Sequence, residues 1–395
     1  MTGLPDIDFG PRTNAFRLEV RDWLARNWKR PKISSEERRH NHIRANREFS
    51  QKLGAKGWLA LSWPKAYGGQ ERPAVDRLVL EEELAYADAP VGWHSTSAGM
   101  IAPTLIIYGS VLQRTQLVTG IGRGDISFAL GYSEPANGSD LAGVRTTATR
   151  TDKGWTIRGQ KIFTSTAGFA DYCWLAARTG PEDSRHAGIS VFIVPLRGTP
   201  GLTIQPMYGL NGHDSNTVFY DDVELPADAI VGEVNQGWKI ITAALAYERV
   251  ALGGVGARVR GYFDRLVEHV NTSSRNSRPM REDPVLRDRL ASFAAEVEGT
   301  RLLAARTALA MDAGKVPMVE AAMLKVTASE LMERLASEAL NILGSGAMLS
   351  ATVDESILDG QFEYSLRDSL LYTIGGGTNE IQRTLIALRG LGLPR

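Results

Sequence analysis

An α+β fold, in which a strand-rich domain separates two helical domains, is predicted by two changes in the texture of the sequence. From about residue 13 to 123 apolar residues recur at helical spacing, as in the segment 74–87. From residue 125 to about 235 the periodicity falls to two, which is typical of strands. Beyond residue 236 long helical segments return, which indicates a bundle. We therefore expect three domains, at residues 1–124, 125–235 and 236–395.

Individual elements follow from local patterns. Trp155 and Ile157 alternate with polar neighbours, the apolar run 189–194 suits a strand, and the DKG sequence at 152–154 favours a hairpin turn. Helices are expected over 238–269, 285–313 and 319–343. No helical segments interleave the strands, which argues against a doubly wound fold. Neither GxGxxG after a strand nor GxxxxGKS/T supports a dinucleotide or P-loop site.

The composition limits the classes of partner. The 395 residues include 45 basic and 45 acidic side chains, so the net charge is zero and no global field attracts nucleic acid or an anionic membrane. No apolar stretch is long enough to span a bilayer, and residues 1–10 lack the features of a targeting peptide. The single cysteine, Cys173, excludes an internal disulfide, and the spacing of the six histidines does not favour a metal site. We expect a cytoplasmic protein.

Four separated motifs resemble those of the acyl-CoA dehydrogenase family. Residues 131–140, GYSEPANGSD, resemble its T/S-E-P-x-x-G-S-D signature. The others are GQKIFTS at 159–165, FYDDVELP at 219–226 and GGGTNEIQR at 375–383, in the family's order. The resemblance implies an N-terminal helical domain, a middle β-barrel or sandwich and a C-terminal four-helix bundle. It also implies an enzyme that uses FAD to introduce an α,β double bond into an acyl-CoA and passes electrons to an electron-transferring flavoprotein.

The resemblance further implies which residues contact the flavin and the substrate. The cofactor-binding residues would be Tyr132, Ser133, Phe163, Ser165 and Thr378. Short hydroxyls such as those of Ser133 and Ser165 suit hydrogen bonding to the polar edge of an isoalloxazine ring. The substrate-binding residues would be Ser139, Arg249 and Gly375. Without other information, a serine hydroxyl is more often hydrogen-bonded to nearby backbone in a turn than to a ligand. The position of these serines within the motifs outweighs that interpretation.

The catalytic base is where the sequence departs from many members of the family. They carry a glutamate just before the G-T of the C-terminal motif, and Gly376 occupies that position here. One interpretation is a non-catalytic or regulatory subunit. The other is the arrangement of isovaleryl-CoA and long-chain members, whose glutamate lies on the first helix of the C-terminal domain. Residues 246–254, AYERVALGG, resemble that helix and place Glu248 at the matching position. We favour Glu248 as the base over an ion pair with Arg249.

Gly376 keeps a role under this interpretation. In the family the backbone N–H at this position binds the thioester carbonyl, and a glycine retains that N–H. The run 375–377 also lacks side-chain volume, so we expect a bulky or branched acyl group. The acid of the signature, Glu134, is expected to be structural because Pro135 fixes the turn after it.

Segments that relatives lend to a neighbouring subunit are altered. The family's R-x-x-F-G-x-P stretch is replaced by SSRNSRP at 273–279, and its Q-x-x-G-G-x-G segment by NILGSGA at 341–347. The chain resembles the base-bearing subunit of actinobacterial heterotetrameric acyl-CoA dehydrogenases for steroid side chains, which implies a tetramer of unlike chains. Alternatively, Arg275 or Arg278 replaces the lost arginine in a homotetramer. A same-fold flavin oxidase or monooxygenase is the rival enzyme class.

Overall fold

The computed structural model describes residues 5–29, 46–90, 96–212, 214–251 and 253–394, without the side chains of residues 214, 246, 248–251 and 253. Contacts within the chain divide it into two units. The first unit comprises Met1–His40, Arg72–Val91 and Arg249–Arg395. The second comprises Asn41–Glu71 and Gly92–Glu248.

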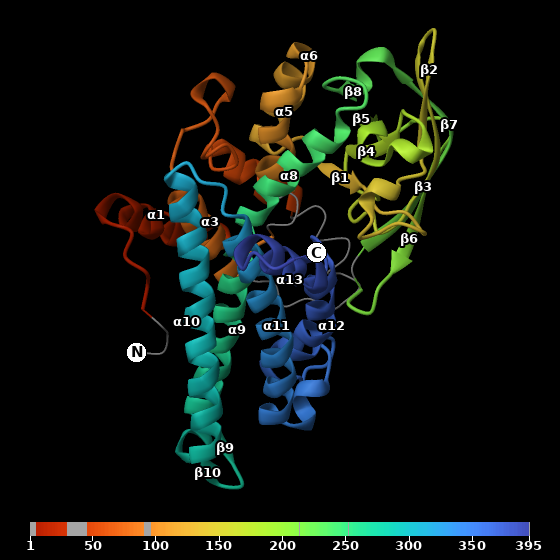
Figure 1. Ribbon diagram of the computed structural model, residues 1–395. Coiled ribbons are helices and arrows are strands. Elements are labelled where there is room, and N and C mark those ends of the chain that lie inside the picture. Colours follow the sequence, from red (N-terminus) through yellow and green to blue (C-terminus); the bar gives the residue numbers. More distant parts are fainter. Residues whose placement is uncertain (1–4, 30–45, 91–95, 213, 252, 395) are drawn as a thin grey trace. The chain divides into compact units, whose positions relative to one another are not determined.

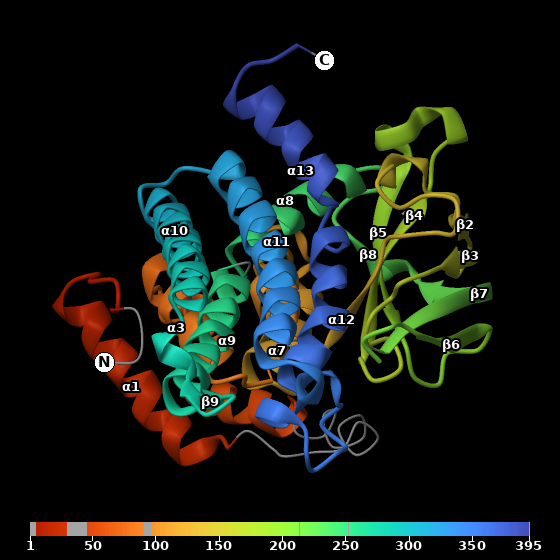
Figure 2. The same ribbon diagram turned by 90° about the horizontal axis from the view of Figure 1, so that it is seen from below.

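The second unit contains an eight-stranded sheet, most of whose strands are labelled in Figure 2. Its order is β6-β7-β3-β2-β4-β5-β8, and β1 pairs in parallel with β4 beside this path. The strands are β1 Phe128–Gly131, β2 Thr147–Thr151, β3 Gly154–Lys161, β4 Tyr172–Arg178, β5 Ile189–Pro195, β6 Leu202–Tyr208, β7 Asp214–Pro226 and β8 Ile230–Val231. The antiparallel pairing of β2 with β3 confirms the predicted hairpin, and the apolar run 189–194 lies within β5.

Side chains of β4 alternate between two cores, because successive residues of a strand point to opposite faces. Cys173 and Leu175 are buried in one core, and Trp174 and Ala176 are buried in the other. The second core is shared with helices of the same unit: η2 Ser97–Ile101, α5 Ala102–Tyr108, η3 Arg114–Val118, α7 Thr119–Arg123 and α8 Gly237–Ala251. Shorter elements are η1 Lys65–Tyr67, α6 Val111–Gln113, η4 Leu141–Gly143, η5 Glu182–Gly188 and η6 Ala227–Ala229. Burial on both faces explains the continuous apolar sequence of β4 and β5.

Long helices packed side by side form the bundle of the first unit (Figure 1). They are α9 Gly253–Thr272, α10 Pro284–Asp312, α11 Met318–Leu343 and α12 Gln361–Ile374. α10 and α11 match the predicted helices 285–313 and 319–343, whereas the predicted segment 238–269 is assigned as α8 and α9 on either side of residue 252, which lies outside the described residues. Shorter elements are β9 Ser274–Arg275, β10 Arg278–Pro279, η7 Met280–Glu282, η8 Ser345–Met348, η9 Ile357–Gly360, α13 Asn379–Leu385 and η10 Ile386–Gly390.

The N-terminal helices α1 Pro11–Asn27 and α3 Ala74–Tyr86 belong to this first unit. Leu78 of α3 shares a core with Ala304 of α10 and Leu324 of α11. Small alanine side chains on α10 allow α3 to pack closely against it. Within the described ranges, no helix has the length and apolarity that crossing a membrane requires.

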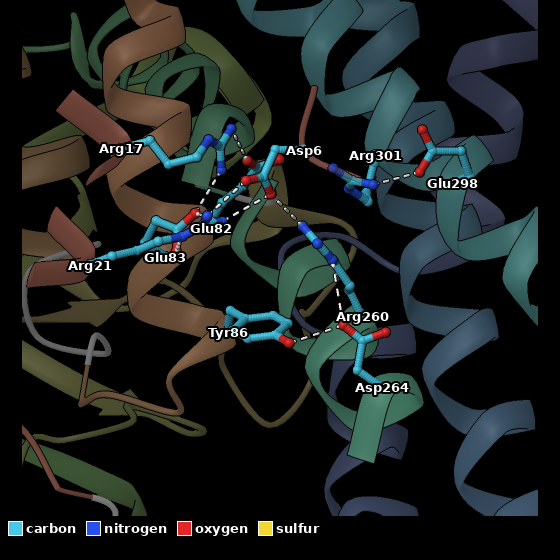
Figure 3. A network of polar contacts seen from close by, with 10 residues as sticks. All are labelled: Asp6, Arg17, Arg21, Glu82, Glu83, Tyr86, Arg260, Asp264, Glu298 and Arg301. Atoms are coloured by element: carbon cyan, nitrogen blue, oxygen red, sulfur yellow. Dashed lines mark hydrogen bonds and ion pairs between the residues drawn. The ribbon is translucent and has the colours of Figure 1, made fainter. Parts of the chain in front are cut away.

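Ion pairs and hydrogen bonds link α1, α3 and α9 within this unit, beside an ion pair within α10 (Figure 3). The members of this network are Asp6, Arg17, Arg21, Glu82, Glu83, Tyr86, Arg260, Asp264, Glu298 and Arg301. Arg17, with a side chain only 3% exposed, lies 2.7 Å from Glu83 Oε1 and 3.0 Å from Glu82 Oε2. Arg21 contacts both Glu83 and Asp6, and its hydrogen bond to Asp6 holds the pKa of that carboxyl well below its usual range. Because each carboxylate faces an arginine, we assign the network a structural role.

Candidate functional site

The segments expected to hold the flavin meet where β1 and β3 end. β1 ends at Gly131, where a Cβ atom would lie 2.7 Å from Cys173 Sγ, so glycine allows β1 to approach β4 closely. Tyr132 and Ser133 follow directly. After β3 ends, the N–H of Ile162 donates to the carbonyl oxygen of Ser133 at 2.9 Å. This hydrogen bond places Tyr132 and Ser133 beside the segment 162–165.

Phe163 and Ser165 occupy a tight turn at the surface. Phe163 has a φ of 52°, and 61% of the residue is exposed. The N–H of Ser165 donates to Phe163 O at 2.9 Å, and the backbone of Thr164 is fixed by hydrogen bonds with Asn216 at 3.0 and 3.1 Å. A left-handed φ is uncommon for an aromatic residue, and such conformations cluster at ligand sites. The turn therefore presents an exposed aromatic ring and an exposed hydroxyl.

A buried ion pair connects the segment that follows β1 to the end of β3. The carboxylate of Glu134 accepts hydrogen bonds from Lys161 Nζ at 2.7 Å and from the N–H groups of Arg145 and Thr146 at 2.8 and 2.9 Å. Burial by itself would raise the pKa of Glu134, but the Lys161 ammonium and the hydrogen bonds with Thr146 outweigh it and hold the pKa below its usual range. The structural role expected for Glu134 thus comes from its carboxylate, whereas Pro135 is exposed.

Ser139, expected at the CoA moiety, is exposed in the turn of the signature. Its neighbour Asp140 pairs with Arg185 at 2.6 Å. The chain that follows is held by Arg178 of β4, whose guanidinium donates to Ala142 O at 2.6 Å and to Val144 O at 3.0 Å. These contacts anchor the base of the turn and leave Ser139 at the surface.

The glycine loop, residues 375–378, joins α12 to α13 in the first unit. Gly376 and Gly377 have φ values of 68° and 86°, a region that favours glycine. The carbonyl of Gly376 accepts from Gln382 Nε2 at 3.2 Å, and the N–H of Gly375 donates to Leu371 O at 2.8 Å. Thr378, expected at the flavin, caps α13 by accepting from the N–H of Ile381 at 3.3 Å. The glycines of the loop are exposed.

Glu248 and Arg249, the expected base and one expected substrate contact, lie on α8, but their side chains are outside the described residues. Ile240 and Ala244 of the same helix are buried in the core shared with the sheet. The structure thus gathers Tyr132, Ser133, Phe163 and Ser165 in the second unit, whereas Gly375, Gly376 and Thr378 lie in a loop of the first.

Buried cations that support these segments were not predicted as functional residues. Lys161, Arg178 and Lys325 are 0%, 6% and 3% exposed. One signal was available in the sequence for Lys161, because it follows Trp155 and Ile157 at even spacing and so continues the buried face of β3. The partners of Arg178 are mostly backbone carbonyls, and Lys325 contacts one backbone carbonyl and the distant Asn379 side chain, so no local sequence pattern identifies either cation.

The chain matches known proteins over nearly its whole length. Residues 11–125, 129–223 and 235–391 match the acyl-CoA dehydrogenase N-terminal, middle and C-terminal domains. Acyl-CoA dehydrogenase FadE26 of Mycobacterium tuberculosis is 37% identical over 98% of this chain and 99% of its own. The human mitochondrial short-chain specific acyl-CoA dehydrogenase is 30% identical over 85% of this chain and 81% of its own. Among solved structures, the ChsE4-ChsE5 complex from Mycobacterium tuberculosis aligns with a TM-score of 0.89 at 35% identity, covering 99% of this chain and 100% of that chain. The Tcur3481-Tcur3483 steroid ACAD aligns with a TM-score of 0.88 at 34% identity and the same coverage.

Proposed function

Because this chain belongs to the acyl-CoA dehydrogenase family, whose members are oxidoreductases that act on acyl-CoA, we propose that it uses FAD to dehydrogenate an acyl-CoA at the α,β bond. The observation that carries the proposal is the surface of Ser133, Phe163 and Ser165, assembled by the Ile162–Ser133 hydrogen bond. The chemistry that FAD would supply when bound is acceptance of the β-hydrogen as a hydride. We propose an electron-transferring flavoprotein as the electron acceptor and the cytoplasm as the compartment.

The donor set of this surface fits an isoalloxazine ring. Such a ring needs hydrogen-bond partners along its polar edge and an apolar contact on its face. Ser133 and Ser165 offer hydroxyls, and Phe163 offers a ring that is 61% exposed although large aromatic side chains are usually well covered. Tyr132, Ser133, Phe163 and Ser165 would hold the ring. Thr378 stays a predicted flavin contact, and its hydroxyl also serves as the cap of α13.

Glu248 is proposed as the general base that removes the α-proton of the thioester. Ile240 and Ala244 of α8 are buried, and position 248 follows at the same four-residue spacing, one helical turn further on. Removal from water raises the basicity of a carboxylate, which is what the abstraction of an α-proton requires.

The test of the base is Glu248→Gln, which keeps the shape of the side chain and removes its basicity. Dye-coupled turnover with an acyl-CoA should fall by about 10²–10⁴-fold, while FAD binding is unchanged. Glu233→Gln, at an exposed glutamate of the same unit, is the matched control. Turnover of Glu248→Gln equal to that of the control would refute the assignment.

The remaining substrate contacts are proposed from the signature and the glycine loop. The N–H of Gly376 would donate to the thioester carbonyl, which stabilises the negative charge that develops on this oxygen as the α-proton leaves. Gly375 would leave space beside the acyl chain, Ser139 would contact the CoA moiety, and Arg249 would contact the substrate. The absence of side-chain volume at 375–377 supports a bulky or branched acyl group.

We propose that the chain is the base-bearing subunit of a heterotetramer that acts on a steroid-type acyl-CoA. The solved relatives support this, since one is the ChsE4-ChsE5 complex and another is named a steroid ACAD. The altered segment 273–279 forms the β9–β10 hairpin, in which the guanidinium of Arg275 donates to Ile342 O of the same chain. The homotetramer alternative needs either Arg275 or Arg278, and because Arg275 makes this contact, Arg278 is the remaining candidate.

Expression with and without a co-expressed homologue tests the assembly. We expect little FAD and little turnover from the chain alone, and a yellow, active complex of unlike chains on co-expression. A soluble, yellow and active homo-oligomer of the chain alone would contradict the heteromer. Rapid reoxidation of the reduced enzyme in air with peroxide release would instead indicate an oxidase.

A further inference from the structure

Lys325 of α11 contacts the two helix ends that flank the glycine loop. The residue is 3% exposed. Its ammonium donates to the carbonyl oxygen of Thr373 at 3.0 Å and to Asn379 Oδ1 at 2.7 Å. Thr373 is in the last turn of α12, and Asn379 is the first residue of α13. One side chain therefore joins the two helix ends between which the loop runs.

The acceptor on α13 is itself held in one orientation. Asn379 Nδ2 donates to Ser329 Oγ at 3.1 Å and to Glu330 Oε1 at 3.0 Å, both on α11. Glu330 also pairs with Arg383 of α13 at 2.7 Å. Since the amide nitrogen of Asn379 is used in this way, its oxygen faces Lys325. The contact between Lys325 and α13 is thus part of a connected network rather than an isolated bond.

The loop has few constraints of its own. Gly375, Gly376 and Gly377 carry no side chains, and glycine has the widest choice of backbone conformations. The hydrogen bond from Gln382 to the Gly376 carbonyl restrains the loop from the α13 side. The loop is attached at the ends of α12 and α13, so the distance between these two ends helps to determine where the Gly376 N–H lies.

We propose that Lys325 is a positioning residue for the reaction: by tying the end of α12 to the start of α13, it sets the place of the Gly376 N–H. The inference rests on the role proposed above for that N–H. Lys325 does not touch the substrate, and no proton or electron passes through it. An error of about 1 Å in such a donor is enough to lower a rate by about 100-fold.

The test compares Lys325→Met with Lys315→Met in the FAD-loaded holoenzyme, including its partner chain if one is required. Lys315 is exposed in the same unit and serves as the matched control. We expect kcat of Lys325→Met to fall by about 10–100-fold, with FAD content and KM changed by less than about threefold. Asn379→Ala should give the same split between kcat and KM. The effect of Lys325→Met should largely disappear in an Asn379→Ala background, since both substitutions remove the same hydrogen bond between α11 and α13.

A second readout isolates the thioester carbonyl. Deuterium exchange at the α-carbon of an acyl-CoA analogue with sulfur in place of the β-carbon reports stabilisation of the α-anion without hydride transfer. Exchange should slow in Lys325→Met by the same factor as kcat. Equal exchange rates in Lys325→Met and Lys315→Met would overturn the inference, as would a loss of FAD in parallel with kcat. If Lys325→Met does not fold, Asn379→Ala is compared with Lys315→Met instead: slower exchange supports the inference, and equal exchange overturns it. Wild-type enzyme that neither exchanges the α-proton nor turns over an acyl-CoA would instead contradict the proposed function.

Discussion

The buried pair of Glu134 and Lys161 gives the most sharply defined prediction. Glu134 directly follows Ser133, and Lys161 directly precedes Ile162, so the pair clamps the two chain segments proposed to hold the flavin. Lys161→Met removes the ammonium and keeps most of the side-chain volume. Glu134→Gln keeps the shape and removes the charge. Either substitution should loosen both segments at once.

The loss of stability for each variant follows from the hydrogen-bond partners that remain after the substitution. Removing one member of a buried ion pair destabilises a protein by about 3–5 kcal/mol. Lys161→Met should lie near 3 kcal/mol, because Glu134 keeps the N–H groups of Arg145 and Thr146. Glu134→Gln should lie near 5 kcal/mol. Its amide oxygen can replace only Oε1, which Lys161 and Thr146 contact, so the new NH2 group faces the N–H of Arg145 and the buried Lys161 ammonium loses its counter-charge. The double variant should fall short of the sum by about 2 kcal/mol, since it leaves no unpaired buried charge.

Urea unfolding with an unchanged m-value measures these losses, and hydrogen exchange of the peptides that cover β1 and β3 localises them. The control is Arg158→Met, which breaks the exposed Arg158–Asp222 pair between β3 and β7 and should cost less than about 1 kcal/mol. The folded-state pKa of Glu134 lies below its ordinary value of 4.5. The contribution of its carboxylate is therefore present above pH 4.5 and is lost as the pH falls through the folded-state pKa. The reasoning is refuted if Lys161→Met is no more destabilising than Arg158→Met.

Other perturbations give distinct outcomes. Arg17→Met removes the buried cation between Glu82 and Glu83 (Figure 3) and should destabilise the first unit by about 3–5 kcal/mol in urea unfolding, whereas Arg26→Met, at an exposed pair, should change it by less than about 1 kcal/mol. Gly376→Ala introduces a side chain at a φ of 68° and should cost about 1–2 kcal/mol, whereas Gly299→Ala, in the exposed middle of α10 with open space for a Cβ atom, should stabilise by about 0.5–1 kcal/mol. Equal signs for the two glycine substitutions in thermal unfolding would contradict this. Burial lowers the pKa of Lys325 to about 8 in the folded protein, although the charges of Glu380 and Glu330 oppose this shift. In the unfolded chain the amine has its ordinary pKa of 10.5, so between these two values the unfolded chain holds the proton and the folded protein does not. The free energy of unfolding should therefore rise between about pH 8 and 10.5 in the wild type but not in Lys325→Met. Urea midpoints with the same pH dependence in both proteins would contradict this expectation.

Much of the fold was predictable because secondary structure depends on spacing that is local in the sequence. The apolar positions of 74–87, 285–313 and 319–343 predicted α3, α10 and α11 to within a few residues of their ends. The alternation around Trp155 and the DKG turn predicted the β2–β3 hairpin for the same reason. The motifs predicted Ser133, Phe163 and Ser165 as flavin contacts without any knowledge of where the segments lie, and these roles stay predictions. The pairing partners of the other strands did not follow, because they depend on contacts between residues far apart in the sequence.

By itself, therefore, the sequence determined the order and type of the elements, the family, and the residue types available for flavin and thioester chemistry. Only the tertiary structure decided that α1 and α3 share a unit with the bundle, and that the end of β1 meets the end of β3. It also decided that Lys161 and Lys325 are buried cations with specific partners. The physical reason is the short range of a hydrogen bond, about 3 Å, since which backbone carbonyls lie within that distance of an ammonium depends on packing between segments far apart in the chain.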